Sequence, residues 1–289
     1  MAITEHGKPA RILVAGCGAL GGRIAQVLSQ RHHVFGLRRN VDQIPQGVER
    51  IGADLLDTQT LAAALPDAVD AMIYCLTPSH YDDDGYRDAY VTGLDNLLSA
   101  LDRSRLRQIV FISSTSVYQQ NDDSWVDETS ETQPARVSGQ CILTGEQRVL
   151  ESGVPATIAR LSGIYGPTRR RFLDSVVRGD MDPTVPSPYT NRIHEADAVA
   201  AVVHLMNQAL AGKTLATHYL VTDCEPVRLA DVVNWIRQQT VCAKPSTDAR
   251  SGGRAGSKRC SNKRLRETGF RFRYPDYRAG YGEMIHGAE

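Results

Sequence analysis

The sequence lacks several features that would assign it to a specialised class of protein. Its apolar runs are far shorter than the roughly 18 residues that a membrane-spanning helix needs. Its six cysteines include no C-x-x-C pair, and several lie in apolar, strand-like runs where a reduced, buried thiol is the ordinary outcome. Lysine plus arginine (33) equals aspartate plus glutamate (33), so the charge excess of a dedicated nucleic-acid-binding protein is missing. These absences favour a cytoplasmic globular protein without a metal site, a membrane anchor or a nucleic-acid partner.

Short apolar runs alternate with segments of helical period through the first 165 residues. The runs predict strands over 12–15, 33–37, 48–51, 71–76, 108–113 and 156–161. Helices of ten to fifteen residues between strands indicate βαβ units, and strands buried on both faces read as continuous apolar runs. We therefore expect an α/β fold with a doubly wound parallel sheet of the Rossmann type.

Beyond residue 165 this alternation becomes less regular. Residues 167–188 hold four prolines and four arginines, and a long apolar helix is predicted over 196–210. We therefore expect a dinucleotide-binding domain formed by residues 1–166 and about 196–223. A smaller, interleaved substrate domain is expected to comprise about 167–195 and 224–289.

The first predicted strand runs directly into a glycine-rich loop. Gly16, Gly18 and Gly21 fit G-x-G-x-x-G, followed at once by a helical segment. In a dinucleotide site, one glycine permits the tight turn, one lets the backbone approach a pyrophosphate, and one allows close helix–strand packing. The N-terminus of the helix then offers N–H groups and partial positive charge to the phosphates. The loop predicts a dinucleotide site.

The second predicted strand ends in Arg38 and Arg39. An NAD site usually places an acid about 20 residues after the first glycine, but this chain has no Asp or Glu between Cys17 and Val41. Guanidinium groups hold phosphate oxygens bidentately, so the pair favours the 2′-phosphate of NADP over NAD. The alternative is a solvated basic strand end.

With these features the chain resembles the NAD-dependent epimerase/dehydratase branch of the extended short-chain dehydrogenase/reductase superfamily, including its atypical members. The most specific segment is 110–118, which resembles the family's fifth strand, with a catalytic Ser or Thr three residues before the Val of a Val-Tyr pair. That likeness places the role on Ser114. Further segments that resemble the family are 48–55, 74–77, 159–167, 191–194 and 257–262.

The glycine motif, the arginine pair and the resemblance together imply a set of site residues. Cofactor contacts are expected from Gly16, Gly18, Ala19, Leu20, Gly21, Arg38, Arg39, Asp54, Leu55, Leu76, Thr77, Ser113 and Leu161. Substrate contacts are expected from Tyr165, Arg169, Arg192 and His194. The arginines would suit a phosphorylated or nucleotide-linked substrate, with solvated loops as the alternative. The family's helix equivalent to 86–101 often forms a dimer bundle, so the resemblance also allows a homodimer.

The sequence departs from the family at its acid/base pair. The superfamily uses a Tyr-x-x-x-Lys motif on the helix after the fifth strand, where the Tyr hydroxyl transfers a proton and the Lys lowers its pKa. Aligning Glu146-Gln147 with the family's common Glu-Gln places Ser138 at the Tyr position and Ile142 at the Lys position. There is no tyrosine between 119 and 164, and no lysine between 9 and 212.

Two interpretations remain open. In the first, the protein is an oxidoreductase or epimerase acting on a sugar-nucleotide-like or other carbonyl or hydroxyl compound through other groups. Candidate substitutes are Tyr118, Tyr165, His80 and His194, near the predicted C-terminal edge of the sheet where open α/β folds bind ligands. In the second, it is a non-catalytic NADP(H)-sensing or scaffold protein.

Overall fold

A computed structural model describes residues 8–252 and 256–287 of the chain. Within them the chain forms two compact units, each built from three separate stretches. The first unit runs through residue 113 and adds 135–159 and 202–218. The second unit comprises 114–134, 160–201 and the residues from 219 onward.

The first architectural feature is a seven-stranded sheet in the order β11-β7-β5-β4-β1-β2-β3. Strand β1 pairs in parallel with β2 and β4, β2 with β3, and β4 with β5. The bounds are β1 Arg11–Ala15, β2 His33–Arg38, β3 Glu49–Gly52, β4 Ala71–Tyr74, β5 Gln108–Ser114, β7 Ala156–Leu161 and β11 His218–Val221. This confirms the predicted Rossmann-type α/β fold, with strand bounds within a few residues of those expected.

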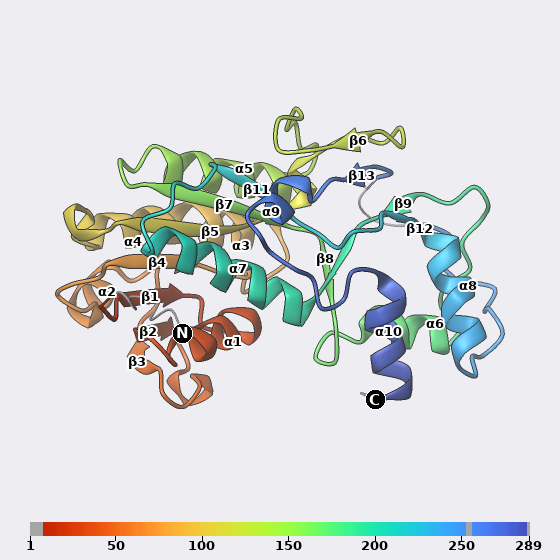
Figure 1. The fold of residues 1–289 in the computed structure, drawn as a ribbon, viewed down its shortest axis with the longest axis horizontal. Helices are drawn as coiled ribbons and strands as arrows, with labels where there is room; N and C mark the ends of the chain where they lie inside the picture. Colours follow the sequence, from red (N-terminus) through yellow and green to blue (C-terminus); the bar gives the residue numbers. More distant parts are fainter. Residues whose placement is uncertain (1–7, 253–255, 288–289) are drawn as a thin grey trace, which may run out of the picture. The chain divides into compact units, whose positions relative to one another are not determined.

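The sheet is parallel because its inner strands carry almost no polar side chain. All four residues of β4 and the first six of β5 are buried, which requires a cover on both faces. Figure 1 shows α1 on the opposite side of the sheet from α4 and α5. The helices are α1 Ala19–Leu28, α2 Thr58–Ala64, α3 Asp83–Arg87, α4 Gly93–Ala100, α5 Val137–Leu150, α6 Arg171–Val177, α7 Glu195–Leu210, α8 Leu229–Gln239, α9 Lys263–Glu267 and α10 Tyr277–His286. A π-helical stretch, Asp88–Thr92, joins α3 to α4.

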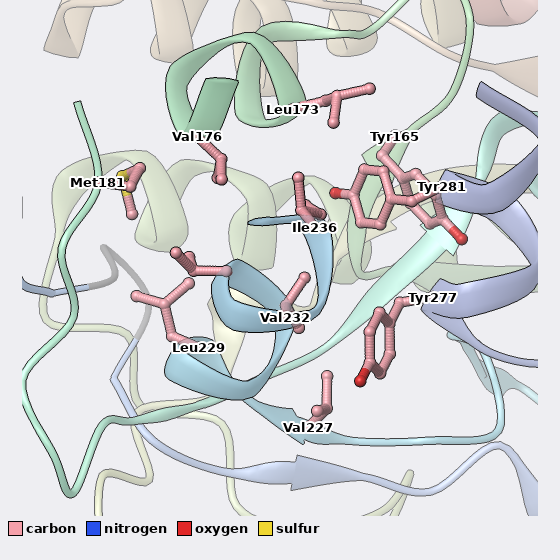
Figure 2. Packing of buried hydrophobic residues seen from close by; sticks show 11 residues of the cluster. Tyr165, Leu173, Val176, Met181, Val227, Leu229, Val232, Ile236, Tyr277 and Tyr281 are labelled. Carbon is pink, nitrogen blue, oxygen red and sulfur yellow. The ribbon is translucent and has the colours of Figure 1, made fainter. Parts of the chain in front are cut away.

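The second unit holds three two-stranded ribbons around its own core. Strand β8 (Gly163–Tyr165) pairs with β10 (Arg192–His194), β9 (Tyr189–Thr190) with β12 (Val227–Arg228), and β6 (Trp125–Val126) with β13 (Arg259–Cys260). Its buried cluster includes side chains from α6, α8 and α10 together with Tyr165 of β8 and Val227 of β12, and Figure 2 shows Tyr165, Tyr277 and Tyr281 at one side of this cluster.

The division of the chain into compact units differs from the expected domains in four stretches. Residues 114–134, 160–166, 196–201 and 219–223 were expected in the dinucleotide domain and belong to the second unit. For 114–134 the reason is local: β6 lies in this stretch and pairs with β13 near the C-terminus, with Trp125 opposite Arg259 and Val126 opposite Cys260. A two-residue strand gives no usable period in the sequence.

No helix in the described ranges is long and apolar enough to cross a bilayer.

Gly145 in α5 tests the packing of this helix onto β5. A β-carbon there would lie 2.7 Å from the carbonyl oxygen of Tyr90 and 2.8 Å from the ring of Phe111, both in the first unit. We expect Gly145→Ala to destabilise the protein by about 1–3 kcal/mol because a rigid backbone group must move. Thermal unfolding followed by circular dichroism measures the change.

The matched control is Gly282→Ala in α10, where a β-carbon meets no described atom within 4 Å. Alanine is the better helix former, so this variant should be neutral or about 0.5–1 kcal/mol more stable. Equal effects at both positions would contradict the packing argument.

Candidate functional site

The glycine loop after β1 is formed by close backbone approaches in the first unit. Gly16 has a φ of +86°, and a β-carbon there would collide with the carbonyl of Cys75. Its N–H and that of Cys17 both donate to the carbonyl of Leu37, at 3.1 Å each. A β-carbon at Gly21 would collide with the carbonyl of Gly16. Two of the three glycines are therefore required by the turn itself.

Gly18 differs from these two glycines because it faces open space. Among the described residues, no atom lies within 4 Å of the position its β-carbon would occupy. It is also the residue before α1, and no described side chain caps that helix. The uncapped helix N-terminus over an open, glycine-lined surface is the arrangement that receives phosphates. The residues present fit the pyrophosphate of a dinucleotide, with Ala19 and Leu20 in the first turn.

The two arginines at the end of β2 lie beside this loop. Arg38 donates from Nη1 to the carbonyl of Cys17 (3.2 Å) and from Nη2 to Gln43 Oε1 (2.6 Å). Exposed Arg39 donates to Ser79 Oγ (2.7 Å), and its Nη1 lies 3.8 Å from Asp54 Oδ2. Arg38 thus contacts the glycine loop directly, and the charge of Arg39, the next residue, is partly balanced by Asp54.

Burial makes the loop's own thiol unreactive. It raises the pKa of Cys17 to about 11, although the neighbouring Arg38 charge acts in the opposite direction. Cys17 therefore serves as a small apolar group beneath the loop.

The remaining expected cofactor residues of the first unit lie at the ends of β3 and β4. Asp54 follows β3 and accepts the N–H of Leu56 at 3.0 Å, while the carbonyl of Leu55 accepts from Asn96 at 2.9 Å. After β4, the carbonyl of half-buried Leu76 accepts from Tyr90 at 3.2 Å, and Thr77 is exposed. All four thus follow the carboxyl ends of parallel strands, the edge at which open α/β sheets bind ligands.

Strand β5 ends in two serines with different surroundings. Ser113 is buried and donates to the carboxylate of Glu146 on α5, itself 1% exposed, while His218 Nε2 lies 3.7 Å from that carboxylate. Ser114 is half-buried, and its Oγ accepts the N–H of Ser116 at 3.1 Å. That bond uses an oxygen lone pair, so the Ser114 proton is still available to a ligand oxygen.

The helix after β5 is α5, and its fourteen residues include neither a tyrosine nor a lysine. Ser138 is half-buried one residue into the helix, and Ile142 is 4% exposed. Glu146 lies one turn beyond Ile142 on the same side of the helix.

Tyr118 is enclosed by its neighbours in the second unit. It is 2% exposed; its hydroxyl donates to the carbonyl of Asp127 (2.8 Å) and accepts from Arg160 Nη1 (2.7 Å). Lys258, also buried, donates to the Tyr118 carbonyl at 3.1 Å. Burial raises the pKa of Tyr118 far above its usual value and lowers that of Lys258. This environment suits a structural anchor for the segment after Ser114.

Tyr165 and His194 pack together in the second unit. The rings of Tyr165 and Tyr281 lie 4.4 Å apart, and Figure 2 shows them side by side. His194 is 2% exposed, lies 3.8 Å from the Tyr274 ring, and accepts the N–H of Ala196 with Nδ1 at 3.2 Å. Burial is the main cause that raises the pKa of Tyr165 well above its ordinary value. Both side chains therefore lie within packed surroundings.

The two arginines that were expected to contact the substrate differ in exposure. Arg169 is exposed, whereas Arg192 is 6% exposed and donates to Thr190 Oγ1 at 3.0 Å. Leu161, at the end of β7, is 4% exposed. The exposed histidine His80 precedes α3. Within 8–252 and 256–287, no cluster of three His, Cys, Asp or Glu side chains could hold a metal ion.

Comparison with known proteins identifies this arrangement. Residues 12–221 match the NAD dependent epimerase/dehydratase family. The chain belongs to that family. The match begins in β1, includes the glycine loop and β5, and ends in β11.

Individual relatives agree with the family assignment. A solved structure from Methylobacillus flagellatus, provisionally described as an NAD-dependent epimerase/dehydratase, is 34% identical, covers 96% of this chain and 98% of its own, and has a TM-score of 0.81. Protein YeeZ of Escherichia coli K12 is 26% identical over 284 residues, which is 92% of this chain and 97% of YeeZ. The UDP-glucose 4-epimerase of Thermus thermophilus, in complex with NAD, shares the fold at 18% identity over 96% of this chain and 98% of its own, with a TM-score of 0.77.

Two buried acids, Glu146 and Asp223, were not proposed as site residues from the sequence. Glu146 entered only through the alignment of Glu146-Gln147, although an acid in an apolar helical stripe is a usable signal of a buried polar contact. Asp223 lies two residues after β11, a strand too short to give a usable period. Only the folded chain brings the two acids to their partners.

Tyr118→Phe tests the structural role of this residue. The variant removes one partner of buried Arg160 and one of the Asp127 carbonyl, so we expect a loss of about 1–3 kcal/mol in stability. Cofactor affinity should remain within about twofold of wild type, since no loop contact changes. Thermal unfolding and a fluorescence titration measure the two quantities; unchanged stability would argue that these bonds contribute nothing.

Proposed function

We propose that this protein is an NADP(H)-dependent enzyme of the epimerase/dehydratase type that acts on a carbonyl or hydroxyl compound without a Tyr-Lys acid/base pair. The observation that carries the proposal is the open, glycine-lined N-terminus of α1 bordered by Arg38 and Arg39. Sugar-nucleotide-like compounds are the substrate class, because relatives that share the fold include UDP-glucose 4-epimerases.

The preference for NADP rests on charge at the adenosine end of the site. The described residues place two guanidinium groups at the end of β2 and a single acid, Asp54, 3.8 Å from one of them. A 2′-phosphate would exchange the bond of Arg38 to Gln43, or that of Arg39 to Ser79, for charge-assisted bonds to phosphate oxygens. NAD offers no such group, so we assign the arginines to NADP.

When it is bound, the nicotinamide supplies hydride transfer. The glycine loop and the α1 N-terminus would hold the pyrophosphate and thereby orient the ring. Ser114 ends β5, which lies two strands from β1 in the sheet order, and its hydroxyl is assigned as a hydrogen-bond donor to the reacting oxygen of the substrate. A serine alone is a weak acid, so its role is polarisation and positioning.

A second candidate, a non-catalytic NADP(H) sensor, is favoured by α5. The alignment on Glu146-Gln147 assigns Ser138 and Ile142 to the positions of the pair, and Ile142 is a buried apolar residue of α5. A sensor retains the cofactor loop while losing the acid/base residues. Both candidates bind the cofactor, but only the enzyme turns over a substrate.

The cofactor assignment predicts a selective effect of the arginines. Arg38→Ala and Arg39→Ala should each weaken NADPH binding about 10- to 100-fold, since a charge-assisted hydrogen bond contributes about 1.5–3 kcal/mol. NADH affinity should change less than threefold. Nicotinamide fluorescence titrations measure both affinities.

The control is Arg50→Ala, which removes an exposed cation from the neighbouring strand β3, two residues before the position opposite Arg38. It should leave both affinities unchanged. Parallel losses of NADPH and NADH binding in the Arg38 and Arg39 variants would refute the 2′-phosphate assignment, and failure of wild type to bind either cofactor would refute both functions.

The enzymatic candidate predicts a specific effect at the end of β5. Ser114→Ala should lower kcat about 10²-fold with unchanged NADPH affinity, because one preorganised donor to a developing charge is removed. Ser116→Ala is the matched control: Ser116 is exposed and donates to Ser114 through its backbone N–H, which the substitution keeps.

The assay combines NADPH oxidation over a panel of carbonyl compounds with NMR detection of epimerised sugar nucleotides. Wild-type turnover that Ser114→Ala retains would contradict the assigned role of this serine. Tight NADPH binding with no turnover on the whole panel would favour the sensor.

A further inference from the structure

Two buried residues of opposite charge are neighbours in the second unit. Arg192 lies in β10 and is 6% exposed, and Asp223 follows β11 and is 1% exposed. Their backbones are joined directly: the N–H of Asp223 donates to the carbonyl of Arg192 at 2.8 Å. Thr222 Oγ1 donates to the same carbonyl at 3.2 Å, which fixes the two segments against each other.

Each of the two side chains keeps one buried polar atom without a hydrogen-bond partner. In the part of the chain that the structure describes, these atoms are Arg192 Nη1 and Asp223 Oδ2. The other atoms are occupied: Arg192 Nη2 donates to Thr190 Oγ1, and Asp223 Oδ1 accepts the N–H of Glu225 at 3.2 Å. Buried polar groups in folded proteins almost always have a hydrogen-bond partner. Two such unpartnered atoms on residues whose main chains are hydrogen-bonded to each other therefore indicate a partner from outside the chain.

The two side chains do not satisfy each other. No ion pair joins them among the described residues, although the charge of Arg192 acts on Asp223. The guanidinium instead interacts with the Tyr281 hydroxyl and lies over the Phe172 ring, 5.6 Å from its centre. A buried cation that lacks a direct counter-charge favours an anion from outside the chain.

The charges around Asp223 favour its neutral form. Burial is the main cause that raises its pKa to about 8; Asp276 and Glu225 add to the rise, and Arg192 and the Glu225 N–H oppose it. The hydroxyls of Tyr165 and Tyr281 also face it, and the Asp223 charge contributes to the raised pKa of each. Below pH 8 the carboxyl is therefore mainly protonated and can donate a hydrogen bond.

We propose that Arg192 and Asp223 form an anion-binding site that takes a carboxylate or phosphate group of a ligand, with Arg192 Nη1 supplying the charge and the Asp223 carboxyl donating a hydrogen bond. One full positive charge is available, which suits a single anionic group. The site deepens the proposed function by assigning an acidic group to the substrate, yet anion binding is measured without cofactor. Its failure and the failure of NADPH binding are therefore separate results.

The test is calorimetric titration of the full-length protein with sodium sulfate and with sodium acetate at constant ionic strength. Sulfate stands for a phosphate source and acetate for a carboxylate source, and neither changes charge between pH 7 and pH 9. We expect saturable binding of at least one of them, and the tighter of the two identifies the source.

Arg192→Met should weaken this binding at least tenfold, because the side chain keeps an unbranched stem and loses its charged guanidinium group. Arg266→Met, an exposed arginine of α9, makes the same change of net charge and should leave binding unaltered. Equal binding by wild type and Arg192→Met, or no saturable binding of either anion, would overturn the proposal.

The pH dependence separates this site from a merely structural pair. Binding to wild type should weaken about tenfold between pH 7 and pH 9, as the protonated fraction of a group with a pKa of about 8 falls from about 0.9 to about 0.1. Asp223→Asn keeps the shape and a donor but cannot ionise, so it should bind equally at both pH values. A pH dependence that persists in Asp223→Asn would overturn the role of Asp223.

A crystal structure of wild type soaked in sulfate and in acetate gives a measurement that does not depend on a variant folding. Density for the anion within hydrogen-bond distance of Arg192 Nη1 and Asp223 Oδ2 is the expected result. A lone water between the two atoms at saturating anion would overturn it.

Discussion

The first unit depends on one residue, Gly16, at which the parallel strands β1, β2 and β4 come close together. Gly16 leaves β1 with its N–H bound to the carbonyl at the end of β2 and with its α-carbon against the carbonyl after β4. There is no space for a side chain, and the positive φ excludes one on conformational grounds as well. Once the turn is fixed there, α1 must begin at Ala19, and its uncapped N–H groups face the open surface at Gly18. The direction of the helix dipole and the position of Arg38 beside the Cys17 carbonyl follow from this turn.

The sequence predicts those parts of this arrangement that consist of residues close together in the chain. The glycine loop, the apolar strands and the arginine pair are contiguous motifs, and the structure brings Arg38 to the loop as its position at the strand end suggests. Tyr118 and His194 also stand beside predicted strand ends, yet their surroundings come from distant residues. Arg160 and Lys258 enclose the first, and Tyr274 lies against the second. A one-dimensional pattern shows which strand a residue follows but not which later segment returns to cover it.

The same limit applies to charge. Asp223 and Arg192 are 31 positions apart, and nothing in their local composition distinguishes them from surface residues. Their burial results from β10 and the end of β11 being joined through their main chains, a long-range contact that amphipathic periodicity does not encode. The contact between Ser113 and Glu146 is partly predictable from the sequence. An acid on an otherwise apolar face of α5 indicates a buried hydrogen-bond partner. That this partner is Ser113 follows only from how α5 packs against β5.

The interleaving of the two units also bears on how the protein is made. The chain passes from one unit to the other at residues 113/114, 134/135, 159/160, 201/202 and 218/219. The first unit is therefore incomplete until residue 218 has left the ribosome, by which time the whole middle stretch of the second unit, residues 160–201, has been synthesised. Domains of many larger proteins fold one after another during synthesis, N-terminal part first. Here each unit needs stretches that are synthesised on both sides of a stretch of the other, so neither can fold as one uninterrupted segment and neither can be excised as a contiguous fragment.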